Sequence, residues 1–332
     1  MKRKLISIFI IMAVLVTSVV PVFAANRTVS QVTAKNKYEL SYKIVNDIFN
    51  NSKITNPKKL VVVNGESIPD LVSGSALAKA MKAPIVYYSK SYETKIVNLI
   101  SDNYLKKQEI YIIGGTGAIP STLDTKIKNK GYKVTRFAGS NRYETNMKVL
   151  KYVNGLCEDF LFVNCDDSLS LKLALRYQSA LDDNSNFLIA IVNKNTLTAS
   201  QKTFFNPFAP KGLIRYTYVV GTTSNITNNL QKTLRAKRVV PSASKLTSIM
   251  NKKATSAVIV PDNNLFYAVL GQEYNYFFNK GKGELIYANY NNHSHLNKYK
   301  SSNITKITLI GSNFSKTELT KLNQLVNQKS GK

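Results

Sequence analysis

Three stretches of this chain repeat one another at an interval of about one hundred residues. In each copy a short apolar strand is followed by a second strand that runs into a glycine turn. The first strands end at Val63, Val163 and Val260, and the turn glycines are Gly114, Gly221 and Gly311. The segment Asn36–Leu40 (NKYEL) also returns as Asn141–Thr145 (NRYET). Landmarks that recur together at one period predict an array of three similar modules.

The first repeat alternates apolar strands with helical patterns along its whole length. Helical periodicity predicts helices over residues 37–50, 70–82, 93–106 and 119–130. Apolar runs predict strands over residues 60–63, 84–88, 109–113 and 132–137. Such alternation is typical of parallel strands joined by right-handed crossovers, and continuously apolar strands indicate a sheet covered on both faces. Each repeat is therefore predicted to be a small Rossmann-like or flavodoxin-like α/β unit.

Repeats two and three keep this skeleton with more drift. Residues 187–192 and 285–288 take the place of the strand predicted over 84–88. The length of 332 residues suits two or three domains. After residues 1–24, boundaries near 135 and 239 divide the chain into repeats over 25–135, 136–239 and 240–332. Because no long linker separates them, the three modules are expected to pack on one another.

The first 24 residues have the pattern of a secretory signal peptide. Three basic residues precede an apolar run from Leu5 to Val20, and the small-residue site Val22–Ala24 follows. An N-terminal membrane anchor is the alternative, but the run is short and is followed by a cleavage-like site. No later stretch approaches the ~18 apolar residues of a membrane span. We therefore expect an exported chain with no stable membrane insertion after cleavage, for which nucleic acid is not the ligand.

The chain is strongly basic, with 46 Lys and Arg against 19 Asp and Glu and a formal net charge of +27. Removal of Lys2, Arg3 and Lys4 with the signal leaves 43 basic and 19 acidic residues, a net charge of +24. Most of the basic residues are lysines spread over all three repeats. A charge of this size concerns partners rather than fold. The expected partner is acidic.

Two motifs could contact an anion. Residues 112–120 (IIGGTGAIP) form a glycine-rich turn between a strand and a helix, which can direct helix N-terminal amides at an anion. The G-x-G-x-x-G spacing and a Walker lysine are absent, so an ordinary tight turn is the alternative. In the second motif, Arg142 could fork onto a phosphate or carboxylate, or could instead be held by Glu144.

Residue types that carry catalysis are scarce. His293 and His295 lie two apart in a polar segment. The acidic pairs at 166–167 and 182–183 have the positions of turns or helix caps. Cys157 and Cys165 flank a predicted strand and are too far apart along it for a disulfide. The sequence therefore predicts no enzyme, no cofactor and no metal site.

The signal, the repeat and the segment 138–145 (AGSNRYET) together resemble the clostridial cell-wall-binding repeats of the second type. Residues 63–73, 83–86 and 113–119 are similar to that family's first strand with its helix start, its second strand and its glycine turn. The resemblance spans residues 27–330 and is specific in repeat one and the start of repeat two. It implies three Rossmann-like modules in a pseudo-threefold arrangement. It further implies non-covalent anchoring to an anionic, phosphate-containing wall polysaccharide or teichoic-acid-like polymer.

Residues at predicted strand ends and helix starts are the candidates for contact with such a polymer, because α/β units bind ligands there. These residues are Lys37, Asp70, Ser89, Lys90, Thr116, Arg136, Asn141 and Arg142. Three linked weak sites would gain avidity on a repeating polymer. The resulting hypothesis is a protein of a Gram-positive cell wall or surface layer, with the wall polysaccharide and surface-layer proteins as its partners.

Two alternatives remain open at this point. An exported enzyme acting on a nucleotide or sugar phosphate predicts one deep pocket with perturbed titratable groups. A structural or adhesive surface protein predicts an exposed apolar patch, for which residues 274–278 (YNYFF) are the candidate. The same stretch would equally suit a packed face between modules.

Overall fold

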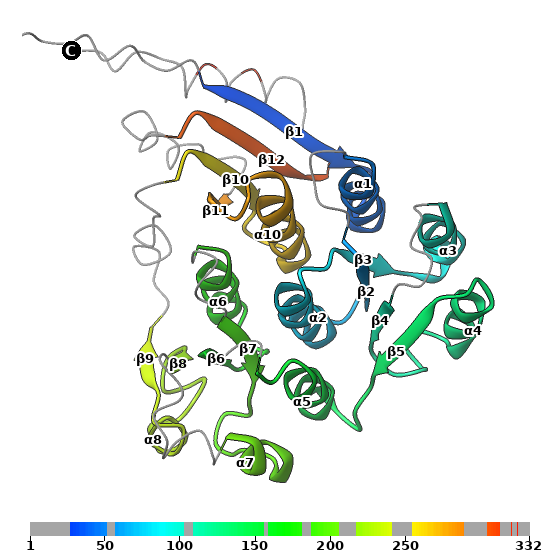
Figure 1. Ribbon diagram of the computed structural model, residues 1–332. Coiled ribbons are helices and arrows are strands. Elements are labelled where there is room, and N and C mark those ends of the chain that lie inside the picture. The colour runs from blue at the N-terminus through cyan, green and yellow to red at the C-terminus, as the bar shows by residue number, and fades with distance from the viewer. Residues whose placement is uncertain are drawn as a thin grey trace, which may run out of the picture.

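Figure 1 shows the computed structural model of the chain. It describes residues 27–51, 57–102, 109–155, 159–180, 187–205, 217–240, 254–288 and 304–312, with the single positions 320 and 324. The predicted signal peptide, Cys157, the acidic pair at 182–183 and both histidines lie outside the described residues. The strands form three four-stranded sheets, in which every pairing is parallel. The predicted α/β class is therefore confirmed.

The first module has the strand order β3-β2-β4-β5. Its strands are β2 (Lys59–Asn64), β3 (Ile85–Tyr88), β4 (Glu109–Ile113) and β5 (Lys133–Phe137). Its α-helices are α1 (Lys37–Asn50), α2 (Ile68–Met81), α3 (Glu93–Asp102) and α4 (Ser121–Asn129). A short 3-10 helix, Lys90–Tyr92, precedes α3. The predicted elements are all present; half of their bounds shift by one or two residues, and the predicted helix end at 106 lies outside the described residues.

Helix caps set two of these bounds. The Asn36 Oδ1 atom accepts hydrogen bonds from the backbone N–H groups of Tyr38 and Glu39, which fixes the start of α1. The Ser67 Oγ atom caps α2 by accepting a hydrogen bond from the backbone N–H group of Asp70, and a proline lies in the first helical turn. Helix α2 therefore begins at Ile68, two residues before the predicted position.

The second module repeats the first with the strand order β7-β6-β8-β9. Its strands are β6 (Asp159–Val163), β7 (Phe187–Ile191), β8 (Thr217–Val220) and β9 (Lys237–Val239). Its helices are α5 (Arg142–Tyr152), α6 (Ser168–Ala180), α7 (Ala199–Phe205) and α8 (Asn228–Thr233). Strand β6 is buried along its whole length, as its apolar run Phe160–Val163 predicts, and Asp159 at its start is buried as well.

The third sheet takes one strand from the opposite end of the chain. It contains β10 (Ser256–Pro261), β11 (Gly283–Ala288) and β12 (Lys306–Ser312), with helix α10 (Leu265–Phe278). Strand β1 (Thr28–Ala34) completes it by pairing in parallel with β12, from Thr28 opposite Lys306 to Ala34 opposite Ser312. In the order β11-β10-β12-β1, strand β1 has the place of β5 and β9 in the other sheets. The sequence analysis did not predict this strand, which closes the three modules into a ring.

Helices α2, α6 and α10 each pack on the following module around the ring (Figure 1). Helix α2 contacts α5 and β7, α6 contacts α10 and β11, and α10 contacts α1. A hydrophobic core with members from all three modules fills the space between them. The pseudo-threefold arrangement is thus observed. In α10, Tyr274, Phe277 and Phe278 are partly buried against this core, which agrees with the interpretation of the stretch 274–278 as a packed face between modules.

Small residues let two of these helices lie close to their own strands. A Cβ atom on Gly74 of α2 would come within 2.3 Å of Val63 Cγ1, and one on Gly271 of α10 within 2.5 Å of Val260 Cγ1. Both glycines lie at the same distance along the chain from the valine that they contact. Within the part of the chain that the structure describes, no helix combines the length and apolar character needed to cross a membrane.

Candidate functional site

A cavity of about 680 Å³ lies where the three modules meet, and we refer to it as the axial cavity. The loop from β2 to α2 lines it with residues 66–70, the start of α5 with Asn141, Arg142 and Thr145, and α10 with Leu265. The loop from β6 to α6 adds Cys165, Asp166, Ser168 and Leu171. Three of the eight predicted contact residues, Asp70, Asn141 and Arg142, therefore line one cavity.

Arg142 is held at the axial cavity by the second module's own loop. Its Nη1 atom lies 2.8 Å from Asp166 Oδ1 and 3.2 Å from Cys165 Sγ. The Asp166 side chain is 70% exposed, and Asp166 rather than Glu144 is the carboxylate that pairs with Arg142. Cys165 is a buried free thiol, and burial raises its pKa. Asn141 caps α5 by accepting from two backbone N–H groups.

The first module repeats this ion pair. Lys37, the counterpart of Arg142, has its Nζ atom 3.2 Å from Glu66 Oε2 and 4.1 Å from the ring centroid of Phe266. The Tyr38 hydroxyl also donates to Glu66. Sequence reasoning found both cations but missed Glu66 and Asp166. The repeat could have identified these two carboxylates, because each lies three residues after the valine that ends the first strand of its repeat.

Asp70 lies between the axial cavity and the glycine turn of its own module. A Cβ atom on Gly114, whose φ is +123°, would come within 3.0 Å of Asp70 Oδ2. Burial raises the pKa of Asp70, and the hydrogen bond with Ser67 opposes that shift. In the second module Ser170 occupies the equivalent place beside Gly221. This position therefore supports the turn in both modules.

A second concavity, of about 400 Å³, lies at the carboxyl ends of β2 and β3 in the first module, and we refer to it as the module-1 groove. Its lining residues are Tyr38, Asn64, Glu66, Tyr88, Ser89, Lys90, Gly117, Ala118 and Pro120. It thus brings together the predicted residues Ser89 and Lys90, and Thr116 is exposed beside it in the turn after β4. Glu66 lines both this groove and the axial cavity.

Lys90 at the rim of the module-1 groove is tied to a buried carboxylate. Its Nζ atom lies 3.1 Å from Glu93 Oε2, and Lys126 pairs with the other oxygen of Glu93. Hydrogen bonding from Lys126, assisted by Tyr88 and Lys90, lowers the pKa of Glu93 to about 2. Glu93 therefore stays ionised at neutral pH and holds both lysines at the carboxyl end of the sheet.

Arg136 has a different environment from the other predicted residues. Its guanidinium forms a forked ion pair with Asp124, with both N–O distances 2.9 Å, and donates to the Gly114 carbonyl at 2.8 Å. Arg238 holds the second module's turn in the same way through the Gly221 carbonyl, also at 2.8 Å. Arg136 therefore holds the glycine turn in place.

Residues 31–124 and 136–231 match the family model described as cell wall binding domain 2 (CWB2). Together the two segments make up more than half of the chain. The chain belongs to the cell wall binding domain 2 family. This confirms the family that the sequence motifs indicated, and it supports binding to the cell wall and a location at the cell wall or surface.

Curated proteins and solved structures agree with this family. N-acetylmuramoyl-L-alanine amidase LytC of Bacillus subtilis is 27% identical over 252 residues, which are 74% of this chain and 45% of LytC. The amidase enhancer of the same organism is 31% identical over 106 residues, 30% of this chain and 14% of that protein. The chain therefore spans less than half the length of either relative.

Two cell wall proteins of Clostridium difficile share the fold. Cwp6 superposes with a TM-score of 0.71 at 14% identity, over 92% of this chain and 49% of Cwp6. Cwp8 also has a TM-score of 0.71, at 17% identity, over 90% of this chain and 52% of Cwp8. At these identities the likeness shows the three-module fold of a CWB2 chain.

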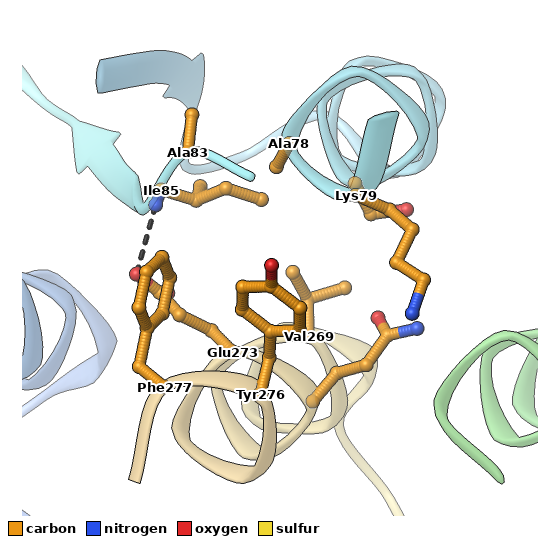
Figure 2. Close-up of a pocket in the computed structure, with 10 residues that line it drawn as sticks. Ala78, Lys79, Ala83, Ile85, Val269, Glu273, Tyr276 and Phe277 are labelled. Carbon is orange, nitrogen blue, oxygen red and sulfur yellow. Dashed lines mark hydrogen bonds between the residues drawn. The ribbon is translucent and has the colours of Figure 1, made fainter. Parts of the chain in front are cut away.

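A third, much smaller cavity of the CWB2 chain bears on the enzyme alternative (Figure 2). It lies between α2, β3 and α10, has a volume of about 40 Å³, and is lined largely by apolar side chains. Glu273 lines it, and burial raises the pKa of that carboxyl well above its usual value. A space of this volume is too small for a nucleotide. Among the described residues no three His, Cys, Asp or Glu side chains gather as metal ligands.

Proposed function

We propose that this chain is exported and anchors itself non-covalently to the cell wall by binding an anionic, phosphate-containing wall polysaccharide or teichoic-acid-like polymer. In this proposal it is a binding protein without catalytic activity of its own, and surface-layer proteins are a second class of partner. The observation that carries the proposal is the placement of Arg142, at a helix start, in a cavity shared by three modules, while the repeat-equivalent cation Lys37 pairs with Glu66, which lines the same cavity.

Both cations are paired with carboxylates that a polymer phosphate can replace. The Glu66 and Asp166 side chains are 69% and 70% exposed. The Arg142–Asp166 pair, with side chains 42% and 70% exposed, is of the kind that contributes only about 0–1 kcal/mol to stability, so its exchange costs little, whereas the Lys37 side chain is only 18% exposed. A phosphate at Arg142 would in return receive charge-assisted, bidentate hydrogen bonds. Asp70 and Asn141 line the same cavity, while Ser89, Lys90 and Thr116 extend the proposed contact surface into the module-1 groove.

The repeat makes weak individual contacts sufficient. A polymer with regularly spaced phosphates presents the same group to each module, and the first contact raises the effective concentration for the next. The net charge of +24 that remains after signal cleavage attracts the polyanion from a distance, and salt screens that attraction. Binding should therefore depend on both the polymer and the ionic strength.

Purified cell walls provide the direct test of the polymer as ligand. The mature chain is incubated with intact walls and with walls stripped of phosphate polymer by mild acid, with salt titrated in both arms. We expect binding to intact walls, weakened by salt, and little binding to stripped walls. Equal binding to both preparations would contradict the proposal and indicate peptidoglycan or a protein as the ligand.

Arg142→Ala tests the site itself. Loss of a charge-assisted contact, worth about 1.5–3 kcal/mol, should weaken binding to intact walls at least about tenfold. The fold should be unaffected because the broken ion pair is exposed. The control is Lys202→Ala, which removes one positive charge from an exposed position on α7. Equal weakening in both variants would mean that diffuse charge, and not this site, holds the polymer.

A further inference from the structure

We propose that the module-1 groove is a subsite for one uncharged pyranose ring of the wall glycan. This inference rests on the proposed function, because it takes the wall polymer as the source of the sugar. It adds to that function a second kind of recognition, in which one module reads a sugar ring while the cations at the axial cavity meet phosphate.

The floor of the groove is an aromatic surface that glycine makes possible. The Tyr38 ring crosses the end of β2 so closely that a Cβ atom on Gly65 would lie 2.2 Å from its Cε1 atom. Tyr38 also stacks on Tyr92, with ring centroids 5.6 Å apart. In the second repeat Cys165 stands where Gly65 stands in the first, so a tyrosine there cannot take the same place. The aromatic floor is thus built in the first module and blocked in the second.

The side of the groove opposite Tyr38 is open in the first module because it lacks a hydrogen bond that the second module forms there. In the second module the backbone N–H of Thr227 donates to the Lys194 carbonyl at 3.0 Å, which joins the turn after β8 to the end of β7. In the first module Pro120 has the position of Thr227 and carries no N–H to make that bond. Asn164 also binds the Asn225 carbonyl across the second module's sheet end, at 3.3 Å.

The lining chemistry fits a neutral sugar better than a phosphate. An apolar C–H face of a pyranose can pack against the part of the Tyr38 ring that lines the groove, and its hydroxyl edge can meet polar groups at the rim. Asn64 accepts from the Glu66 backbone N–H through Oδ1, which keeps its NH₂ group as a donor, and Ser89 adds a hydroxyl. The two charged lining groups are each already paired, Glu66 with Lys37 and Lys90 with Glu93.

The position of the groove agrees with this assignment. In the strand order β3-β2-β4-β5 the connections leave β2 and β4 toward opposite edges, and open α/β sheets bind ligands at such a switch point. The volume of about 400 Å³ lies within the usual range of small-ligand sites. Because Glu66 borders both spaces, one polymer can place a sugar in the groove and a phosphate at the axial cavity.

Gly117→Trp tests the subsite by filling it. Gly117 lines the groove, a Cβ atom there would meet nothing within 4 Å, and its φ is not left-handed, so the variant should fold. The matched control is Gly115→Trp, at a glycine of the same turn with equally open surroundings that does not line the groove. The probes are methyl glycosides of glucose, galactose, mannose and N-acetylglucosamine, followed by saturation-transfer difference NMR on the mature chain.

We expect at least one glycoside to bind the wild-type chain and the Gly115→Trp variant, and to bind Gly117→Trp at least about tenfold more weakly. Inorganic phosphate at matched ionic strength should not displace the sugar. Absence of binding by all four glycosides, displacement by phosphate, or equal binding to both variants would each overturn the inference. Cell-wall pulldown of the same three proteins distinguishes the two proposals: wall binding without sugar binding refutes only the subsite, and sugar binding without wall binding refutes the anchoring function.

Discussion

Arg176→Met should lower the free energy of unfolding by about 3–5 kcal/mol, because it removes the cation that faces a buried carboxylate. Arg176 belongs to α6 of the second module and pairs with Glu284 on β11 of the third. Their side chains are 3% and 1% exposed, so water cannot replace the lost partner. Urea denaturation of the mature chain at neutral pH measures the loss.

The double variant Arg176→Met/Glu284→Leu should recover most of that loss, since apolar pairs of similar size often replace buried ion pairs without cost. The exposed pair provides the control: Arg142→Met should change the free energy of unfolding by less than about 1 kcal/mol. If the double variant is as unstable as Arg176→Met, then altered side-chain packing at this interface, and not the loss of the cation beside Glu284, determines the effect.

Glu273 should make the folded chain less stable as the pH rises above about 4.5. Its Oε1 atom accepts the Ile85 N–H at 2.9 Å across the interface between the third and first modules, as Figure 2 shows. Burial raises the pKa of this carboxyl well above 4.5 in the folded chain, while the unfolded chain keeps the ordinary value. Below 4.5 both states are protonated and the stabilising effect is complete. Above it the unfolded state ionises first, and stability falls by ~1.4 kcal/mol per pH unit until the folded-state pKa is reached.

Comparison with Glu273→Gln isolates this titration from all others in the chain. Glutamine does not ionise, and it can accept the same hydrogen bond from Ile85. Lys79 and Tyr276, which line the same cavity, are common to both proteins. The difference in free energy of unfolding should therefore move in favour of Glu273→Gln between about pH 5 and pH 8. A difference that stays constant with pH would show that Glu273 is already ionised in the folded chain.

Sequence patterns predicted the elements that are stabilised locally or buried on both faces. Strands β2, β6 and β10 have apolar, buried centres, as expected of parallel strands that are covered on both faces. Strand β1 lacked that signal, since its sequence TVSQVTA is only partly buried. Its partner β12 follows some 270 residues later in the chain, so no local pattern could identify the pairing.

Only part of the candidate site was predicted, again because local sequence patterns do not show contacts between distant segments. Lys37 and Arg142 stood out because they share a motif, whereas Glu66 and Asp166 become visible only when the repeats are aligned on the ends of their first strands. Arg136 also lies at a strand end. Its partner Asp124 belongs to α4, and no pattern in the sequence shows that these two side chains face each other. Position at a strand end indicated where polar side chains gather. Tertiary contacts determine which of these side chains already form an ion pair or hydrogen bond within the chain.

The interfaces between modules escaped prediction because equivalent positions have diverged. Ala76, Arg176 and Glu273 each lie thirteen residues after the valine that ends the first strand of their repeat. Arg176 meets Glu284, and Glu273 meets the backbone of Ile85. If two modules exchanged places, these groups would face the wrong partners. Arg176 and Glu273 therefore favour the observed partner at each of these two interfaces.

The pairing of β1 with β12 has a mechanical consequence for a chain held in a wall. The strands are parallel over seven residues, so the chain enters β1 at one end of the ladder and leaves β12 at the other. Tension applied between the start of β1 and the end of β12 would pull the strands along their axes in opposite directions. The hydrogen bonds of the ladder would then share the load instead of opening one at a time. Resistance to such a pull is governed by the rate of unfolding, so this ladder can set the lifetime of the anchored chain under force.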